Sequence, residues 1–275
     1  NPIMAMTKQL ISPKELKKIL NNNNLKILDS RWFLNESQKG LKDFKKSHIP
    51  NAIFFDIEKN SNQQIELPHM IPKKNQFEKY LDKNGISSKN LIVIYDQSGF
   101  FSSARVWFML RYFGFKNVKI LEQGFQGWLN NNYPITKLIK QPEKKKNKII
   151  EKKELIKDKE FISKNLRKDN LLIIDARSEK RFLGLEKEKR PNLYSGNIPG
   201  SINIPYTSLS KNGKFLKKNN LIKIFKKSMN LDKKKNIVCT CGSGITACNI
   251  ILALDILGFN NYNLYDGSWA EWGKK

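Results

Sequence analysis

The chain has 275 residues and a formal net charge of +26, from 51 Lys and Arg against 25 Asp and Glu. This length is sufficient for two domains with their own cores. Three cysteines at irregular spacing exclude a disulfide framework. The absence of a Cys-x-x-Cys pair and the presence of only two histidines argue against a metal site. No apolar run approaches the roughly 20 residues of a membrane helix, and the first residues lack the pattern of a signal peptide. The free thiols favour a reducing, cytoplasmic compartment.

The basic residues are mostly lysines, spread along the chain together with abundant Asn and Ile. A positive charge of this size raises the question of a nucleic-acid partner. However, the sequence contains no helix-turn-helix pattern, no aromatic RNA-binding motif and no zinc finger. We therefore expect a solvated, lysine-rich surface, with no specific nucleic-acid partner and no membrane partner.

The first half of the chain alternates expected helices and strands. A helix is predicted from Pro13, with Leu16, Ile19 and Leu20 on one face. Strands are expected at residues 25–28, 53–55, 91–95 and 118–121, helices at 13–22, 75–83 and 103–112, and a short segment opening at Gly124. Asp29 follows the first of these strands, and Asp96 follows the third.

The second half repeats this order at an offset of about 145 residues. Its strands are expected at residues 171–174, 202–204, 237–240 and 263–265, with an apolar helix at 245–257 and a last segment opening at Asp266. Alternating strands and helices predict an α/β fold, with a mostly parallel sheet flanked by helices in each half. We expect domains at residues 5–136 and 151–275, joined by a charged linker at 137–150 that contains Pro142.

The most informative stretch is the loop Cys241-Gly242-Ser243-Gly244-Ile245-Thr246, between a strand and a helix. Glycines let successive backbone N–H groups turn toward one point, and a helix N-terminus adds partial positive charge. Both effects favour a thiolate, so Cys241 is a candidate nucleophile. The simpler interpretation is that a cysteine there is a small buried hydrophobe, and we adopt it for Cys239 and Cys248.

The repeat distinguishes these interpretations for Cys241, because Asp96 occupies the same register in the first half. A purely structural, buried cysteine would rarely be matched by a charged residue. The pair is more easily explained if both positions are exposed at the carboxyl end of a strand, where α/β sheets place their sites. The repeat therefore favours a functional role for Cys241.

With these motifs in view, the chain resembles the two-domain rhodanese sulfurtransferases over nearly its whole length. The resemblance rests on the tandem domains, on a cysteine loop in the second only, and on the ending Tyr265-Asp266-Gly267-Ser268-Trp269-Ala270-Glu271-Trp272. The loop Cys-Gly-Ser-Gly-Ile-Thr is similar to the Cys-Gly-Ser-Gly-Val-Thr loop of the 3-mercaptopyruvate sulfurtransferases within that family. Thiosulfate sulfurtransferases carry basic residues after the cysteine, which a doubly charged donor would need. The neutral Gly242 and Ser243 suit a less charged donor.

The resemblance also implies roles for single residues. Arg181 and Arg190 match the pair that holds the substrate carboxylate, whereas Arg177 looks structural, like Arg31. Asp56 and His69 match first-domain residues that form a relay with the loop serine, here Ser243, which would place the site in the interdomain cleft. The backbone amides of Gly242, Gly244, Ile245 and Thr246 would bind the product, and Thr246 would fix the loop at the helix start. One departure is Pro68, where the family commonly has an acidic residue.

The reaction implied is sulfur transfer from 3-mercaptopyruvate to Cys241, which releases pyruvate and leaves a persulfide. A thiol such as that of reduced thioredoxin, or cyanide in the test tube, would accept the sulfur, and no metal or organic cofactor is needed. Three alternatives remain. A thiosulfate sulfurtransferase is the nearest, and a non-catalytic rhodanese-like binding module is the second. A thiol phosphatase would need an arginine where this chain has Ala247.

Overall fold

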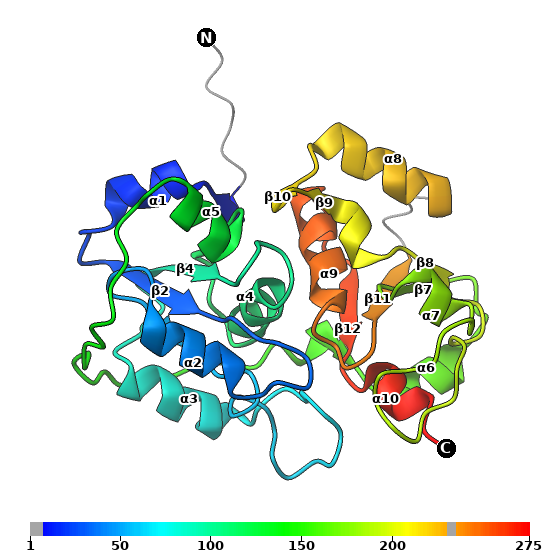
Figure 1. The fold of residues 1–275 in the computed structure, drawn as a ribbon. Helices are drawn as coiled ribbons and strands as arrows, with labels where there is room; N and C mark the ends of the chain where they lie inside the picture. The colour runs from blue at the N-terminus through cyan, green and yellow to red at the C-terminus, as the bar shows by residue number, and fades with distance from the viewer. Residues whose placement is uncertain (1–7, 230–234) are drawn as a thin grey trace. The chain divides into compact units, whose positions relative to one another are not determined.

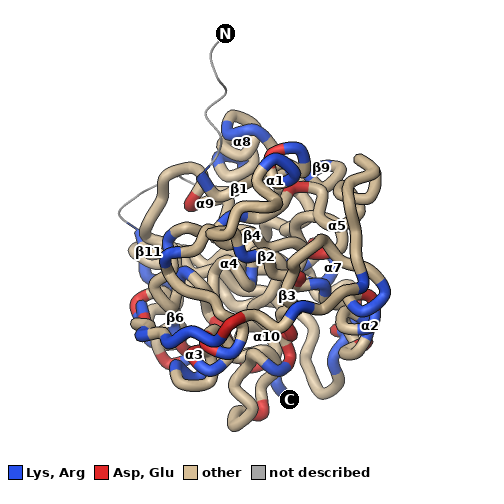
Figure 2. The backbone as a smooth tube through the Cα atoms, turned by 90° about the vertical axis from the view of Figure 1, so that its left-hand side faces the viewer, with Lys and Arg blue, Asp and Glu red and all other residues tan. Residues whose placement is uncertain are grey.

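The computed structural model describes residues 8–229 and 235–275, which form two compact units (Figure 1). Of the described residues, one unit contains those up to Asn60 together with Pro72–Lys152 and Asn212–Lys214. The other contains Ser61–Ile71, Lys153–Lys211 and the described residues from Phe215 to Lys275. Within the described ranges, no helix is long and apolar enough to cross a membrane. Figure 2 shows Lys and Arg recurring over many helices and loops of the face in view, rather than in one element.

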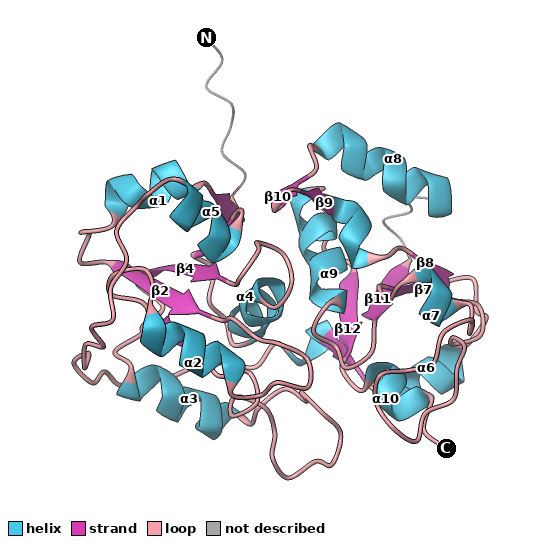
Figure 3. Ribbon diagram, in the orientation of Figure 1, coloured by secondary structure: helices cyan, strands magenta, loops and turns pink. Residues whose placement is uncertain are grey.

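Each unit is built on a five-stranded sheet in which every pairing is parallel (Figure 3). The strand orders are β1-β5-β4-β2-β3 and β6-β12-β11-β7-β8, the same order in both copies. This architecture confirms the predicted α/β class with mostly parallel sheets flanked by helices. The site loop follows β11, a central strand, so it lies at the carboxyl edge where three strands end together.

The elements of the first unit are β1 (Leu10–Ile11), α1 (Pro13–Ile19), β2 (Leu25–Asp29), α2 (Lys39–Lys46), β3 (Ile53–Phe54), α3 (Lys74–Lys83), β4 (Leu91–Tyr95), α4 (Ser103–Tyr112), β5 (Val118–Leu121) and α5 (Gly124–Asn130). Successive β4 side chains point to opposite faces of the sheet. Val93 and Tyr95 pack in one cluster with Leu16 of α1 and Trp128 of α5, while α4 covers β4 and β5. Because Ile92 and Ile94 are also fully buried, both faces of this strand are covered, as expected for a parallel sheet.

After residue 152 the elements are a 3-10 helix (Lys153–Leu155), β6 (Ile156–Lys157), α6 (Lys159–Asn165), β7 (Leu171–Asp175), α7 (Glu179–Phe182), β8 (Ile202–Asn203), a second 3-10 helix (Tyr206–Leu209), the paired β9 (Ser210–Lys211) and β10 (Lys214–Phe215), α8 (Lys218–Ser228), β11 (Asn236–Thr240), α9 (Ala247–Ile256), β12 (Tyr262–Tyr265) and α10 (Ser268–Trp272). Val238 of β11 packs with Ile162 of α6 and Trp269 of α10. The buried helix α9 lies against β11 and β12.

The charged stretch at residues 137–150, predicted as a linker, contains no helix or strand and runs along the first unit. The backbone N–H of Asn147 donates to Asp82 Oδ1 at 2.8 Å, and its side-chain amide donates to the carbonyl of Ile86 at 2.7 Å. Further along, Lys152 N–H donates to the carbonyl of Tyr112 at 2.8 Å. These bonds hold the stretch to the ends of α3 and α4.

Candidate active site

Cys241 lies between β11 and α9 and is almost fully buried, with 2% of its surface exposed. The N–H of Gly244 donates to its sulfur at 3.1 Å. Gly244 has a φ of +86°, a left-handed conformation that glycine adopts without steric cost, and this turns its N–H back toward the cysteine. A donor aimed at the sulfur stabilises negative charge there, as a thiolate nucleophile requires.

The expectation that Asp96 and Cys241 are both exposed was wrong. Asp96 is completely buried, like Cys241. The loop that follows Asp96 folds over its carboxylate, which accepts five backbone N–H bonds from residues 98, 99, 101, 102 and 103. A charged side chain can therefore be buried at this strand end, because the loop itself supplies the hydrogen bonds that water would otherwise make.

The backbone of Cys241 is held from the start of α10. Its N–H donates to Ser268 Oγ at 3.2 Å, and its carbonyl accepts the N–H of Trp269 at 2.9 Å. One residue further, the carbonyl of Gly242 accepts the N–H of Ala270 at 2.9 Å. Sequence reasoning treated Ser268 only as part of a motif, because no local signal marks a serine as the partner of a residue so distant in the chain.

Ser243 and His69 meet beside the cysteine loop. His69 Nδ1 lies 2.8 Å from Ser243 Oγ, and Arg190 Nη2 donates to the same oxygen at 3.1 Å. A guanidinium can only donate, so Ser243 Oγ accepts from Arg190, whereas the direction of its bond with His69 depends on which ring nitrogen of His69 carries the proton. Both residues are buried, with His69 at 5% and Ser243 at 4% exposure. The structure thus brings together two of the three members of the predicted relay.

The segment Ser61–Ile71, which carries His69, groups with the second unit, although we predicted it as part of the first domain. The N–H of Ile71 donates to Asp266 Oδ2 at 2.6 Å, which ties the segment to the loop before α10. Asp56 belongs to the first unit, where its carboxylate accepts the N–H of Lys59 at 3.1 Å and so stabilises a local turn. Its place in the relay therefore stays a prediction.

Two guanidinium groups lie against the backbone next to Cys241. A Cβ added to Gly242 would lie 3.1 Å from Arg181 Nη2 and 3.2 Å from Arg190 Nη1. The pair predicted to hold a carboxylate is therefore adjacent to the candidate nucleophile. Because glycine has no side chain, both arginines can approach this part of the loop closely.

Glu188 is a residue that the sequence analysis missed. Its Oε2 accepts from Arg181 Nε at 2.9 Å, its Oε1 accepts from Arg177, and its side chain is only 3% exposed. Arg177 also forms a buried ion pair with Asp175 at 2.7 Å, the counterpart of the pair between Asp29 and Arg31 at 2.8 Å. Burial removes water from the ion pair, yet the carboxylates around Arg177 keep its pKa raised, so Arg177 stays charged. Glu188 thus links this structural arginine to Arg181.

Two other loop expectations have different outcomes. Thr246 is the N-cap residue of α9, but its side chain makes no capping hydrogen bond, so the expected fixing of the loop by its hydroxyl was wrong. The backbone angles of Thr246 are helical, and its carbonyl accepts the N–H of Asn249 at 3.0 Å. Thr246 is therefore bonded to the helix through its backbone. Ile245 is buried, and its carbonyl accepts the N–H of Cys248 at 3.2 Å. The binding roles assigned to Ile245 and Thr246 stay predictions.

Cys239 and Cys248 are both fully buried. Burial raises the pKa of the Cys239 thiol well above its usual range, and the neighbouring cysteines act in the same direction. Cys248 Sγ donates to the carbonyl of Gly244 at 3.3 Å. These positions are consistent with a packing role for both side chains.

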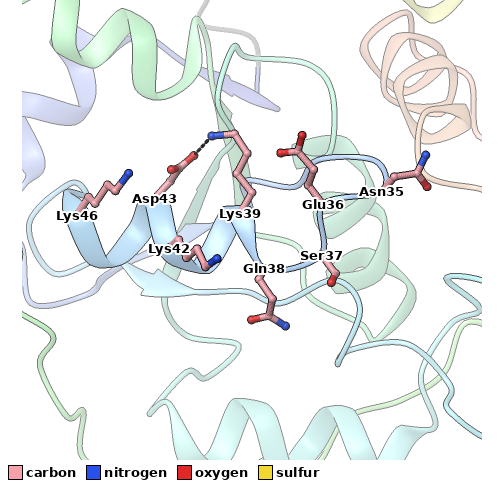
Figure 4. A pocket seen from close by; sticks show the side chains of 8 residues that line it. All are labelled: Asn35, Glu36, Ser37, Gln38, Lys39, Lys42, Asp43 and Lys46. Carbon is pink, nitrogen blue, oxygen red and sulfur yellow. Dashed lines mark hydrogen bonds and ion pairs between the residues drawn. The ribbon is translucent and has the colours of Figure 1, made fainter.

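A separate hollow of about 490 Å³ lies beside the start of α2 in the first unit (Figure 4). Lys39 and Asp43 point toward one another at its edge and form an ion pair at 3.0 Å. Its lining is charged and polar and contains no cysteine, histidine or arginine. It offers none of the chemistry found around Cys241.

Comparison with known proteins identifies the class. The model of the rhodanese-like domain matches residues 12–131 and 158–275, so the chain belongs to the rhodanese family and carries two such domains. This confirms the family predicted from the sequence. The chain is 38% identical to the 3-mercaptopyruvate sulfurtransferase of Mus musculus over 94% of its length and 88% of that protein.

Two further comparisons give the same family. The thiosulfate sulfurtransferase of Rattus norvegicus is 31% identical, over 98% of this chain and 94% of that protein. Among solved structures, SseA from Escherichia coli, a 3-mercaptopyruvate sulfotransferase with the rhodanese fold, superposes with a TM-score of 0.86 at 30% identity. The match covers 95% of this chain and 99% of SseA.

Proposed function

We propose that the protein is a 3-mercaptopyruvate sulfurtransferase in which Cys241 carries the sulfur as a persulfide. The observation that best supports this proposal is the N–H of Gly244 donated to Cys241 Sγ at 3.1 Å, on a loop flanked by Arg181 and Arg190. An activated sulfur beside two carboxylate-binding groups fits a donor that carries both a thiol and a carboxylate. The names of the relatives with 36–38% identity support the same donor.

In the first half-reaction, the Cys241 thiolate attacks the sulfur of 3-mercaptopyruvate. A bond forms between the two sulfur atoms, and the donor's carbon–sulfur bond breaks. The electron pair of that bond goes to the carbon, which gives the enolate of pyruvate, and protonation then yields pyruvate. Arg181 and Arg190 orient the carboxylate, so the step gains from positioning. His69 accepts the thiol proton through Ser243, and both side chains are already within hydrogen-bonding distance.

In the second half-reaction, an acceptor thiolate attacks the outer sulfur, and the sulfur–sulfur bond at Cys241 breaks to regenerate the thiolate. Backbone amides of Gly242, Gly244, Ile245 and Thr246 stabilise the charged persulfide in our account. We propose a thiol acceptor such as reduced thioredoxin, in a reducing, cytoplasmic compartment. The three free cysteines of the chain support a reducing environment.

The environment of the loop favours 3-mercaptopyruvate over thiosulfate. Gly242 and Ser243 carry no charge, and Arg181 already shares its positive charge with the buried carboxylate of Glu188. A doubly charged anion would gain less here than at a loop with free basic residues. Thiosulfate stays a second candidate donor, because relatives with 31–33% identity are thiosulfate sulfurtransferases.

The test is a comparison of sulfur transfer to cyanide by the wild type and Cys241→Ser, with each donor in turn. We expect a higher kcat/KM with 3-mercaptopyruvate than with thiosulfate, and loss of both activities on substitution. A preference for thiosulfate would overturn the donor but keep the nucleophile. No turnover with either donor would favour the non-catalytic binding module, and release of phosphate from aryl phosphates would favour a phosphatase.

A further inference from the structure

Ser268, the first residue of α10, has an unusual backbone conformation. Its φ is +51°, in the left-handed region that is unfavourable for residues with a side chain, and the residue is completely buried. Such conformations persist where surrounding structure enforces them, and they cluster at functional sites. Unlike glycine, serine has a Cβ that makes this conformation unfavourable. The presence of a serine here therefore needs a reason other than the bend.

The internal repeat provides a comparison within the same molecule. In the first unit, Phe125 N–H donates to the carbonyl of Asp96 at 2.8 Å, as Trp269 N–H donates to that of Cys241 at 2.9 Å. The next residue in each copy bonds one position further along each loop. This correspondence aligns Ser268 with Gly124, whose φ is +55°. The unit without a cysteine therefore makes the same bend with glycine.

The first copy has no room for a side chain at this position. A Cβ added to Gly124 would lie 2.5 Å from the carbonyl oxygen of Asp96 and 2.7 Å from the backbone nitrogen of Gly99. In the second copy the corresponding loop accommodates the serine side chain. The bend itself thus requires no hydroxyl, and glycine is the residue that best tolerates it.

The hydroxyl of Ser268 connects the end of β12 to the cysteine. Its Oγ accepts the N–H of Cys241 at 3.2 Å and donates to the carbonyl of Tyr265 at 2.9 Å. Without the hydroxyl, this buried N–H of the cysteine would lose its acceptor, which is costly in a site that excludes water. These two bonds fix the backbone from which the sulfur projects toward the N–H of Gly244.

We propose that Ser268 is a positioning residue that holds the Cys241 backbone so that the sulfur meets the Gly244 N–H. This inference rests on the proposed role of Cys241 as the nucleophile. It assigns the unfavourable backbone of Ser268 to function, since a glycine would make the bend more easily but could not bind the cysteine N–H. Ser268 touches no substrate in this account and acts only through Cys241.

Two substitutions separate the hydroxyl from the bend. Ser268→Ala removes the hydroxyl and keeps the strained conformation, whereas Ser268→Gly removes the hydroxyl and relieves the strain. A matched control is Ser102→Ala, which removes a buried hydroxyl that donates to the carbonyl of Ser30 in the first unit at 2.7 Å. Each variant would be characterised by its thermal midpoint, by the single-turnover rate of persulfide formation with 3-mercaptopyruvate, and by the pH dependence of Cys241 alkylation with iodoacetamide.

We expect both Ser268 variants to form the persulfide about tenfold more slowly, because a factor of this size corresponds to the loss of roughly one buried hydrogen bond. Ser268→Gly should have a higher midpoint than Ser268→Ala, and alkylation of Cys241 should move to higher pH in both, because the sulfur loses its aligned N–H donor. His69, Arg181 and Arg190 are unchanged in both variants, so they cannot cause this shift. Ser102→Ala should lower the midpoint but leave the rate and the alkylation profile unchanged.

Wild-type rates and wild-type alkylation profiles in both Ser268 variants would overturn the proposal. So would a rate that falls only in proportion to the unfolded fraction, since a merely structural serine would give that result. Failure of the proposed function has a different signature. If Cys241→Ser keeps sulfur transfer, the nucleophile is misassigned, while the alkylation profile of Cys241 still reports whether Ser268 positions it.

Discussion

Asp96 in the first unit is the structural counterpart of Cys241 in the second. Each residue follows a central strand, and the carbonyl of each accepts an N–H from the start of the last helix of its unit. The loop after Asp96 directs five backbone N–H groups at a carboxylate, and the loop after Cys241 directs the N–H of Gly244 at a sulfur. In both copies, therefore, a backbone N–H of the loop donates to the side chain at the end of the central strand. In the first unit the side chain in this position is the carboxylate of Asp96, and in the second unit it is the thiol of Cys241.

Asp96→Asn tests whether the first loop depends on that charge. The amide would present an NH₂ group to the N–H donors of Phe101, Ser102 and Ser103. Donors facing donors repel each other, so several buried hydrogen bonds would be lost. We expect the variant to lose about 3 kcal/mol of unfolding free energy, measured by urea denaturation. As a control, Asp169→Asn alters an exposed aspartate and should change stability by less than about 0.5 kcal/mol. Equal stability of the two variants would show that the amide cradle does not need the carboxylate.

The two buried arginines of the repeat should differ in function although they resemble each other in structure. Arg31→Leu and Arg177→Leu each leave a buried aspartate without its ion-pair partner, which costs about 3–5 kcal/mol in systems of this kind. Urea denaturation should detect a loss in both variants. Because Arg177 also binds Glu188, its substitution alone should raise the KM for 3-mercaptopyruvate. A KM that rises equally in both variants would contradict the link from Arg177 through Glu188 to Arg181.

Glu188→Gln tests the charge argument for donor choice. Removing the carboxylate's charge leaves the positive charge of Arg181 without its neighbouring negative charge and its side chain less firmly held, so a doubly charged donor gains relative to a singly charged one. We expect the ratio of kcat/KM for thiosulfate to that for 3-mercaptopyruvate to rise by about threefold to tenfold. Glu186→Gln changes an exposed glutamate nearby and serves as the control. An unchanged ratio in Glu188→Gln would mean that Glu188 does not influence donor choice.

The three cysteines should react differently with iodoacetamide. Cys239 lies inside β11, is fully buried and has a raised pKa, so it stays protonated to higher pH than an ordinary thiol and reacts poorly near neutral pH. Cys241 receives an N–H bond at its sulfur and should be modified first. Peptide mass spectrometry after a short exposure would map the sites, and unfolding in urea should make all three reactive. Equal labelling of Cys239 and Cys241 in the folded protein would contradict the assignment.

Much of the fold could be predicted from local pattern. The strand predicted at residues 91–95 is β4 (Leu91–Tyr95), and the helix predicted at 103–112 is α4 (Ser103–Tyr112), since long apolar runs leave little ambiguity. The helix α2 (Lys39–Lys46) was missed, because it contains a glycine and buries only Gly40 and Phe44. The two-residue strand β1 (Leu10–Ile11) is too short to produce a periodic signal.

The site was less accessible to such reasoning, because its geometry depends on distant partners. The loop sequence and the repeat were enough to select Cys241. His69 could be proposed only through the resemblance, since its bond to Ser243 spans 174 residues. Ser268 and Glu188 were missed for the same reason. A left-handed serine and a shared carboxylate have no local signature, and nothing in the sequence distinguishes Glu188 from the neighbouring Glu186.

The most direct test of the account is the mass of the Cys241 peptide after the protein has reacted with 3-mercaptopyruvate in the absence of an acceptor. We predict a mass increase of one sulfur atom on Cys241, accompanied by one equivalent of pyruvate, and loss of the added sulfur when cyanide is supplied. Cys239 and Cys248 should stay unmodified. Pyruvate release without added sulfur on Cys241, or added sulfur on another cysteine, would contradict the central claim that Cys241 is the sulfur carrier.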